Sequence, residues 1–282
     1  MGAAGPKHVA EQIMPLSSRL RWPDGPTLHR KTTALSSSVR ITEIIDKVPV
    51  SRFQRRAIAI CLALAFADGF NVLAIGYAIP SLARSYGVAA ADFSIVVIAA
   101  LVAEILSNFL IAPLADRHGR KRIMSIGIVV FGLAAVPSFF ASSVLALAAC
   151  RFVAGIGIGA AVPNGFALGN EYSPTRLKTT TVTVLSSGTA VGGLTVGIIA
   201  SWLVPARSGE ALLLVAGIVP LVILIATWHW LPESIEFLAK TGHSTKVASI
   251  LDKIEIGTSH SADTEYLLPP QPIGARVAAL FT

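Results

Sequence analysis

Charged residues are scarce in this sequence: they make up 14% of its 282 residues, against roughly 25% in an ordinary soluble domain. Cysteine is scarcer still, with two residues, so no disulfide framework can hold the chain together. Hydrophobic residues, by contrast, account for 53% of the chain even without glycine. One soluble core of this size cannot bury that much apolar surface. The composition therefore excludes a disordered or collagen-like chain and disfavours a soluble enzyme.

The apolar residues are concentrated in six runs of about 20 residues, the length at which a helix crosses a bilayer. The predicted spans are 57–79, 93–114, 123–141, 146–169, 180–203 and 211–231. The fifth run is the weakest because several serines and threonines dilute it. The chain is thus predicted to be an all-α membrane protein with six transmembrane helices.

The polar parts of the chain lie at its two ends. Residues 1–40 are polar and rich in proline and serine, which predicts a disordered N-terminal segment. The six-span domain covers 41–239 and opens with a short amphipathic lead-in at 41–53. The tail, 240–282, corresponds to a linker and contains one predicted helix near 244–256.

Lysine and arginine are distributed unevenly between the two sides of the predicted membrane domain. Thirteen lie on the side of the N-terminus: Arg40, Lys47, Arg52, Arg55, Arg56, Arg117, Arg120, Lys121, Arg122, Arg176, Lys178, Lys240 and Lys246. Arg84 and Arg207 lie on the other side. The positive-inside rule then predicts a plasma-membrane or inner-membrane protein with both termini in the cytoplasm. Topology accounts for the net charge of +7, so no nucleic-acid partner is expected.

Three ionisable side chains fall inside the predicted spans: Asp68, Glu104 and Arg151. Each costs about 2.5–3.5 kcal/mol at a helix centre, so these side chains are expected to face a cavity or one another. Asn71 shares a helical face with Asp68, and Asn108 shares one with Glu104. Two interpretations remain open. The residues form structural contacts between helices, or they form a site in which a carboxyl carries protons and the arginine compensates an anion.

Glycines recur at four-residue spacing in the fourth and fifth spans. The pairs are Gly155 with Gly159, Gly188 with Gly192, and Gly193 with Gly197. This G-x-x-x-G spacing allows two helices to approach closely. The segment 155–160 also fits the dinucleotide-binding pattern G-x-G-x-x-A, but no βαβ unit surrounds it. Helix packing is therefore the predicted role of these glycines.

The connection between spans two and three reads Asp116-Arg117-His118-Gly119-Arg120-Lys121-Arg122. A membrane-surface anchor accounts for its basic residues, but not for the acid that opens it or for a glycine suited to a tight turn. From Ala112 onward, the segment resembles the signature loop of the major facilitator superfamily, G-x-x-x-D-[RK]-x-G-[RK]-[RK]-[RK]. Ala112 replaces the first glycine of that pattern. The resemblance implies gating residues Asp116, Arg117, Gly119, Arg120 and Lys121.

Further segments resemble the same family, in the expected order. Arg151 with the glycines after it resembles the fourth-helix motif, 170–176 the loop that follows, and 231–234 with Phe237 the motif closing helix six. In the first span, Asp68-Gly69-Phe70 is most similar to aromatic acid:proton symporters. The resemblance implies the N-terminal half of a major facilitator fold, built as a 3+3 inverted repeat.

The resemblance also implies roles for individual residues. Asp68 matches the first acid of the symporters' D-G-F-D, whereas Asn71 replaces the second, so one titratable group is absent. Asp68 would take and release protons, Arg151 would balance a carboxylate, and 116–122 would gate the cytoplasmic side. The candidate substrate and proton-coupling residues are Asp68, Asn71, Glu104, Arg151 and Asn164. The expected partners are a small organic anion, protons and the lipid bilayer, with a proton gradient in place of a cofactor.

Transporters of this family have twelve spans, whereas this chain ends where a seventh would begin. The expectation is a half-transporter that works with a second half or a second copy of the chain. The alternative is a non-transporting fragment, or a regulatory or sensor protein that uses its tail. A membrane-embedded enzyme is not expected, because His229 is the only histidine within the spans and no metal-ligand cluster is present.

Overall fold

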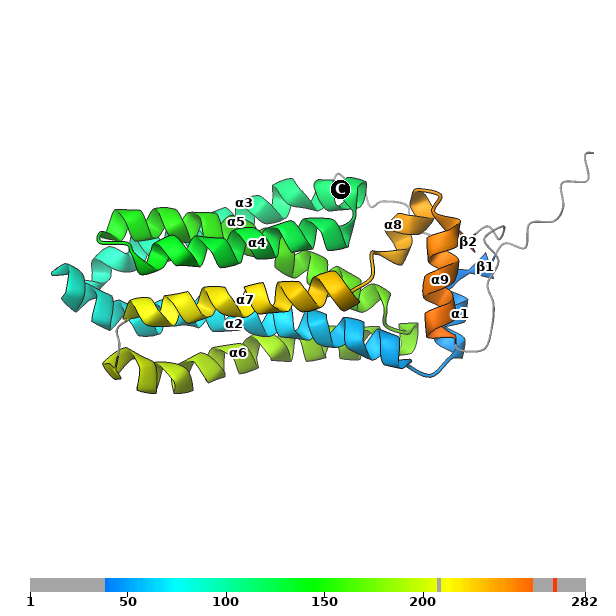
Figure 1. Cartoon of the computed structure of the whole chain (residues 1–282), viewed down its shortest axis with the longest axis horizontal. Helices are drawn as coiled ribbons and strands as arrows, with labels where there is room; N and C mark the ends of the chain where they lie inside the picture. The colour runs from blue at the N-terminus through cyan, green and yellow to red at the C-terminus, as the bar shows by residue number, and fades with distance from the viewer. Residues whose placement is uncertain (1–38, 207–208, 256–265, 268–282) are drawn as a thin grey trace, which may run out of the picture. The chain divides into compact units, whose positions relative to one another are not determined.

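The computed structural model describes residues 39–206, 209–255 and 266–267. Its elements, shown in Figure 1, are β1 (Val39–Arg40), α1 (Ile41–Lys47), α2 (Arg52–Tyr86), η2 (Ala90–Phe93), α3 (Ser94–His118), α4 (Arg120–Phe139), α5 (Val144–Glu171), η3 (Thr175–Leu177), α6 (Lys178–Ala206), α7 (Gly209–Trp230), α8 (Ile235–Lys240), α9 (Ser244–Ile254) and β2 (Tyr266–Leu267). The segment expected to be disordered, 1–40, lies outside the described residues except for its last two. These two form β1, which pairs in parallel with β2.

The six long helices, α2 to α7, correspond one to one with the predicted spans. Each is long and apolar enough to cross a membrane. A helix satisfies its own backbone hydrogen bonds, which is what a chain in hydrocarbon requires. The prediction of an all-α membrane protein with six spanning helices is therefore confirmed.

Helices α2, α3 and α4 have the same pattern of contacts as helices α5, α6 and α7 (Figure 1). Helix α2 packs against α6 and α7, and α5 packs against α3 and α4. When α2, α3 and α4 are exchanged for α5, α6 and α7, each of these contacts becomes another one of the set. The remaining major contacts, α2 with α5 and α4 with α7, map onto themselves. This exchange is the contact pattern of a 3+3 repeat, and it places α2 and α5 side by side.

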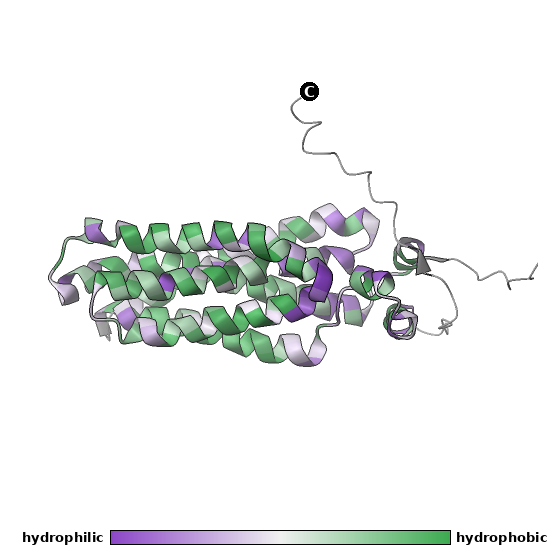
Figure 2. Cartoon of the chain, turned by 90° about the horizontal axis from the view of Figure 1, so that it is seen from above, coloured by the Kyte–Doolittle hydropathy of each residue, from purple (hydrophilic) through white to green (hydrophobic). Residues whose placement is uncertain are grey.

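The surface of the bundle is apolar along its length, as Figure 2 shows, and hydrophilic residues concentrate toward the end near α8 and α9. Large apolar side chains are exposed on the outside, among them Phe109 (78% exposed) and Trp202 (80%). An exposed apolar surface that extends over six helices is unfavourable in water and favourable in lipid. The described part of the chain is thus built to have hydrocarbon around it.

Three short helices cover one end of the bundle, which we call the covered end. The isoleucines of α1 and the apolar face of α9 pack into one core with the adjacent ends of α2, α4, α5 and α7. Polar contacts hold the chain before α2 as well. Asp46 Oδ1 accepts from the Thr175 amide at 2.6 Å, and Arg176 donates to the Asp46 carbonyl at 3.0 Å. Helix α9 coincides with the helix predicted near 244–256.

Candidate functional site

Arg151 is buried in the bundle and reaches from α5 to α2. Its Nη1 donates a hydrogen bond of 2.6 Å to Oδ1 of Asn71. The arginine is 4% exposed and the asparagine 6%. The only side chain that binds this guanidinium within the described residues is therefore a neutral amide.

Three polar atoms of residues singled out in the sequence have no hydrogen-bond partner in the described part of the chain. They are Nε of Arg151, Oδ1 of Asp68 and Oδ1 of Asn108. A buried polar atom without a partner costs roughly 1–3 kcal/mol, so such atoms are uncommon in finished protein cores. We call Asp68, Asn71, Glu104, Asn108 and Arg151 the central cluster.

A cavity of about 50 Å³ opens beside the pair, between α2, α3 and α5. Asn71, Glu104 and Arg151 line it together with apolar side chains. Asp68 lies one turn before Asn71 on the same face of α2. The structure thus brings together four of the five predicted site residues. A cavity of this size holds a few water molecules at most. It is much smaller than a ligand cleft, which measures roughly 300–1,000 Å³.

The fifth predicted residue, Asn164, is engaged elsewhere. Its Nδ2 donates to the Ala160 carbonyl of its own helix at 2.8 Å. It lies more than three turns beyond Arg151 on α5 and does not line the cavity between α2, α3 and α5. A substrate or proton role for Asn164 therefore has no support from its position.

The glycines of α5 explain how α3 is placed against Arg151. A Cβ at Gly159 would lie 2.5 Å from the Glu104 carbonyl, and one at Gly155 would overlap the Ala100 carbonyl. The two backbones touch along this face, which sets the depth of Glu104 in the bundle. The glycines of α6 also face α2. A Cβ at Gly188 or Gly192 would meet the α2 backbone, whereas one at Gly193 or Gly197 would meet the side chains of Leu73 and Tyr77.

A second polar cluster lies at the covered end, and here nearly every group is paired. Arg120 at the start of α4 forms an ion pair with Glu171 Oε1 at the end of α5. The other oxygen of Glu171 accepts from Ser234 Oγ at 2.7 Å. Asp116 and Glu236 lie 3.6 and 3.9 Å from the Arg120 guanidinium. We call Asp116, Arg120, Glu171, Glu233, Ser234 and Glu236 the terminal cluster.

Glu233 binds the turn between α3 and α4. Its Oε1 accepts from the backbone amides of Lys121 (2.8 Å) and Ser234 (2.9 Å). The predicted loop 116–122 is in fact two helix ends that meet at one residue, Gly119, with φ of 99°. A Cβ on Gly119 would lie 2.6 Å from Glu233 Oε2. The turn is this short because a glycine permits both the left-handed backbone and the approach of the carboxylate.

Tyr172, the residue that follows α5, binds to the same region. Its hydroxyl donates to the Glu233 carbonyl at 2.6 Å, and its carbonyl accepts from the buried Gln54 amide at 2.9 Å. Burial raises the pKa of Tyr172 well above its usual value, so the phenol keeps its proton and remains a donor.

The sequence predicted the gating residues Asp116, Arg117, Gly119, Arg120 and Lys121, but not the glutamates that bind the Arg120 side chain and the Lys121 amide. Glu171, Glu233 and Glu236 stand in quoted motifs, but nothing in the local pattern indicated that they meet Arg120. The charges could have predicted these contacts, because the segments that contain the glutamates lie on the same side of the predicted membrane domain as the basic turn. Among the predicted gating residues, Arg117 is exposed and forms no hydrogen bond or ion pair within the described residues. No group of metal-ligating side chains is found in that part of the chain either.

The repeat of helices and the two polar clusters define a multi-pass membrane protein with a transporter-like fold. Residues 58–273 match the Major Facilitator Superfamily, and the chain belongs to that family. The resemblance read from the sequence is therefore confirmed.

Two relatives and one solved structure are similar to this chain. The chain is 35% identical over 240 residues to a 4-hydroxybenzoate transporter, PcaK, of Acinetobacter baylyi, covering 85% of this chain and 52% of the relative. It is 32% identical over 233 residues to a gallate transporter of Pseudomonas putida, covering 82% and 51%. The proton:xylose symporter XylE has the same fold, with a TM-score of 0.65 at 18% identity, over 72% of this chain and 50% of that one. The chain thus spans about half the length of the relatives it matches, which are transporters and not enzymes.

Proposed function

We propose that this chain forms one half of a proton-coupled transporter for small aromatic carboxylic acids. The relatives named above transport 4-hydroxybenzoate and gallate, which are both benzoates with a negative carboxylate. The substrate would bind on the face of α2 and α5 toward the middle of the membrane, where a second half or a second copy completes the wall. The cavity in this half is too small to enclose it alone.

Arg151 is the observation that carries the proposal. A buried guanidinium remains charged, and a buried charge is costly unless an opposite charge or several hydrogen bonds compensate it. Here a neutral amide takes one hydrogen bond and Nε has no partner. A carboxylate arriving beside Arg151 supplies both the missing charge and the missing acceptors. A neutral sugar would supply only hydrogen bonds.

Asp68 is the proposed proton carrier. It is a carboxyl within an apolar helix, one of its oxygens lacks a partner, and it lies one turn from Asn71, which binds Arg151. A carboxyl group in this position can take up a proton on one side of the membrane and release it on the other. We also propose that the covered end and both termini face the cytoplasm of the plasma or inner membrane, because the basic residues gather on that side.

Binding and transport test the proposal separately. The chain in lipid nanodiscs is titrated with labelled 4-hydroxybenzoate and with xylose, and proteoliposomes are assayed for uptake under an imposed pH gradient. We expect the benzoate to bind and xylose not to bind, with Arg151→Gln removing binding and Arg117→Gln leaving it intact. Uptake independent of the pH gradient would contradict proton coupling. Absence of any aromatic-acid binding, also in nanodiscs large enough to hold two copies of the chain, would favour the regulatory or sensor alternative.

A further inference from the structure

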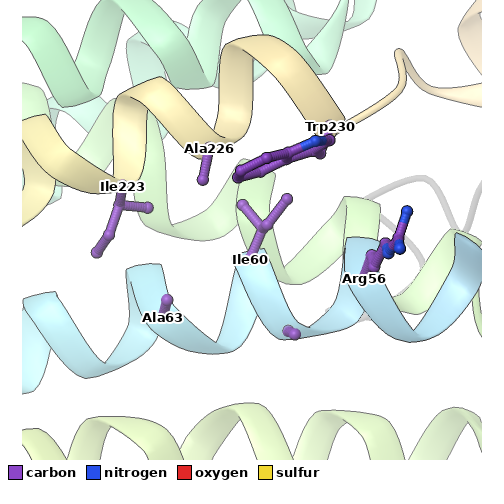
Figure 3. Close-up of a pocket in the computed structure, with 7 residues that line it drawn as sticks. Arg56, Ile60, Ala63, Ile223, Ala226 and Trp230 are labelled. Atoms are coloured by element: carbon purple, nitrogen blue, oxygen red, sulfur yellow. The ribbon is translucent and has the colours of Figure 1, made fainter. Parts of the chain in front are cut away.

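A groove runs along the outside of the bundle between α2 and α7, next to the covered end. One stripe of each helix forms a wall, with Arg56, Ile60 and Ala63 on α2 and Ile223, Ala226 and Trp230 on α7 (Figure 3). The cavity volume is about 430 Å³. This is the size of a ligand cleft, and the transport mechanism proposed above makes no use of it.

The floor of the groove is deep because its residues are small. Ala59 and Ala63 are one turn apart on α2, and Ala226 faces them from α7. Apart from Arg56 and Trp230 at one end of the groove, the remaining lining side chains are those of Ile60 and Ile223. A flexible hydrocarbon chain fits such a furrow better than a rigid polar molecule does.

The end of the groove is cationic. The Arg56 side chain is exposed and forms no hydrogen bond or ion pair within the described residues. Arg52 and Arg55, also exposed, extend the positive charge at the same end of α2. Trp230, 61% exposed, lies across the groove from Ile60 (Figure 3). Tryptophan and arginine at one level of a membrane helix mark the interface between headgroups and hydrocarbon.

We propose that this groove binds one anionic phospholipid from the surrounding leaflet. The phosphate would pair with Arg56, and one acyl chain would lie in the furrow over the alanines, beneath Trp230. Basic pockets between membrane helices bind anionic headgroups for the same electrostatic reason. A neighbouring groove between α4 and α7 has a tryptophan and two basic residues as well, but Glu233 lines it and Lys121 already binds the Trp228 carbonyl. The charge therefore favours the α2–α7 groove.

Quenching of Trp230 fluorescence by brominated lipid tests the proposal in the full chain. Trp22, Trp202 and Trp228 are changed to Phe, so that Trp230 is the remaining tryptophan. The protein is placed in phosphatidylcholine nanodiscs that contain about 10 mol% of either dibromo-phosphatidylglycerol or dibromo-phosphatidylcholine. This fraction is enough because a binding site enriches its lipid next to the protein. We expect the anionic lipid to quench about threefold more than the neutral one. Equal quenching by the two lipids would overturn the proposal.

Three variants separate the site from general attraction to a positive surface. Arg56→Gln should reduce quenching by the anionic lipid to the phosphatidylcholine value, whereas Arg56→Lys should retain most of it. Ala63→Leu should fill the furrow and reduce quenching although the charge is intact. Arg84→Gln, which removes a charge at the other end of α2, is the control. An equal loss in that variant, or displacement of the lipid by soluble glycerol phosphate, would refute the lipid site.

Discussion

The central cluster and the terminal cluster contain similar residues, but the polar groups are nearly all paired in the terminal cluster and incompletely paired in the central cluster. Both are built around an arginine with carboxyl groups nearby. At the covered end, Arg120 pairs with Glu171, and both oxygens of Glu171 are occupied. In the middle of the bundle, Arg151 has one neutral partner, and three polar atoms of the central cluster have none within the described residues.

From this difference we infer that the terminal cluster stabilises the helix bundle and that the central cluster is the one that binds a ligand. A network whose groups satisfy one another within the half contributes to its stability, and losing one member leaves others unpaired. A cluster with unpaired groups has given up stability, which a substrate or proton can restore on binding. We therefore expect substitutions at the terminal cluster to lower stability and substitutions at the central cluster to alter binding.

Arg120→Gln should give the largest effect. It leaves Glu171, whose side chain is 6% exposed, without its cation. Breaking a buried ion pair costs about 3 kcal/mol or more, so the thermal unfolding midpoint in nanodiscs should fall by several degrees. The double variant Arg120→Gln/Glu171→Gln should recover part of the loss, because no unpaired charge remains. Arg117→Gln is the matched control, and an equal fall there would show that the ion pair is not the cause.

Arg151→Gln should weaken binding of an aromatic carboxylate by about 100-fold, or about 2.7 kcal/mol. The unfolding midpoint should change little, because the variant removes an incompletely paired buried charge. Isothermal titration and thermal unfolding on the same sample measure both quantities. A large loss of stability with unchanged affinity would reverse the assignment of the two clusters.

Gly119→Ala should destabilise the chain by about 2 kcal/mol, since it combines a strained backbone with a Cβ pressed against Glu233. Gly242 also has a positive φ (74°), with open space around it. The variant Gly242→Ala therefore measures the cost of a positive φ without a side-chain clash, about 1 kcal/mol. Equal effects in thermal unfolding of the two variants would mean that the Glu233 contact does not constrain the turn.

Asn71→Asp should have the smallest effect and the most specific one. It gives Arg151 a charged partner, which then competes with the substrate carboxylate. We expect carboxylate affinity to fall by about tenfold, measured by titration with the labelled benzoate. Asn108→Asp places the same added charge on a residue that does not bind Arg151. A tenfold loss in that control too would attribute the effect to charge in general.

The sequence predicted the spans well because each is a continuous apolar run, and lipid imposes that pattern locally. The family motifs also led to Arg120 and Arg151. The partners were harder to predict. Asn71 shares a helical face with Asp68, but its hydrogen bond to Arg151 depends on how α5 lies against α2. Glu171 and Glu233 meet the turn at Gly119 from segments about 50 and 110 residues away, and no local spacing rule reports such contacts.

The packing of α1 against α9 has a consequence for the order in which the chain is made. The apolar face of α1 leaves the ribosome about 200 residues before α9 does. At roughly 5–20 residues per second, this delay is about 10–40 s. During that time the part of the apolar face of α1 that α9 covers is exposed, and an amphipathic segment in this state adsorbs to a membrane surface. Helix α1 would therefore wait at the bilayer as a temporary anchor and leave it only when α9 arrives.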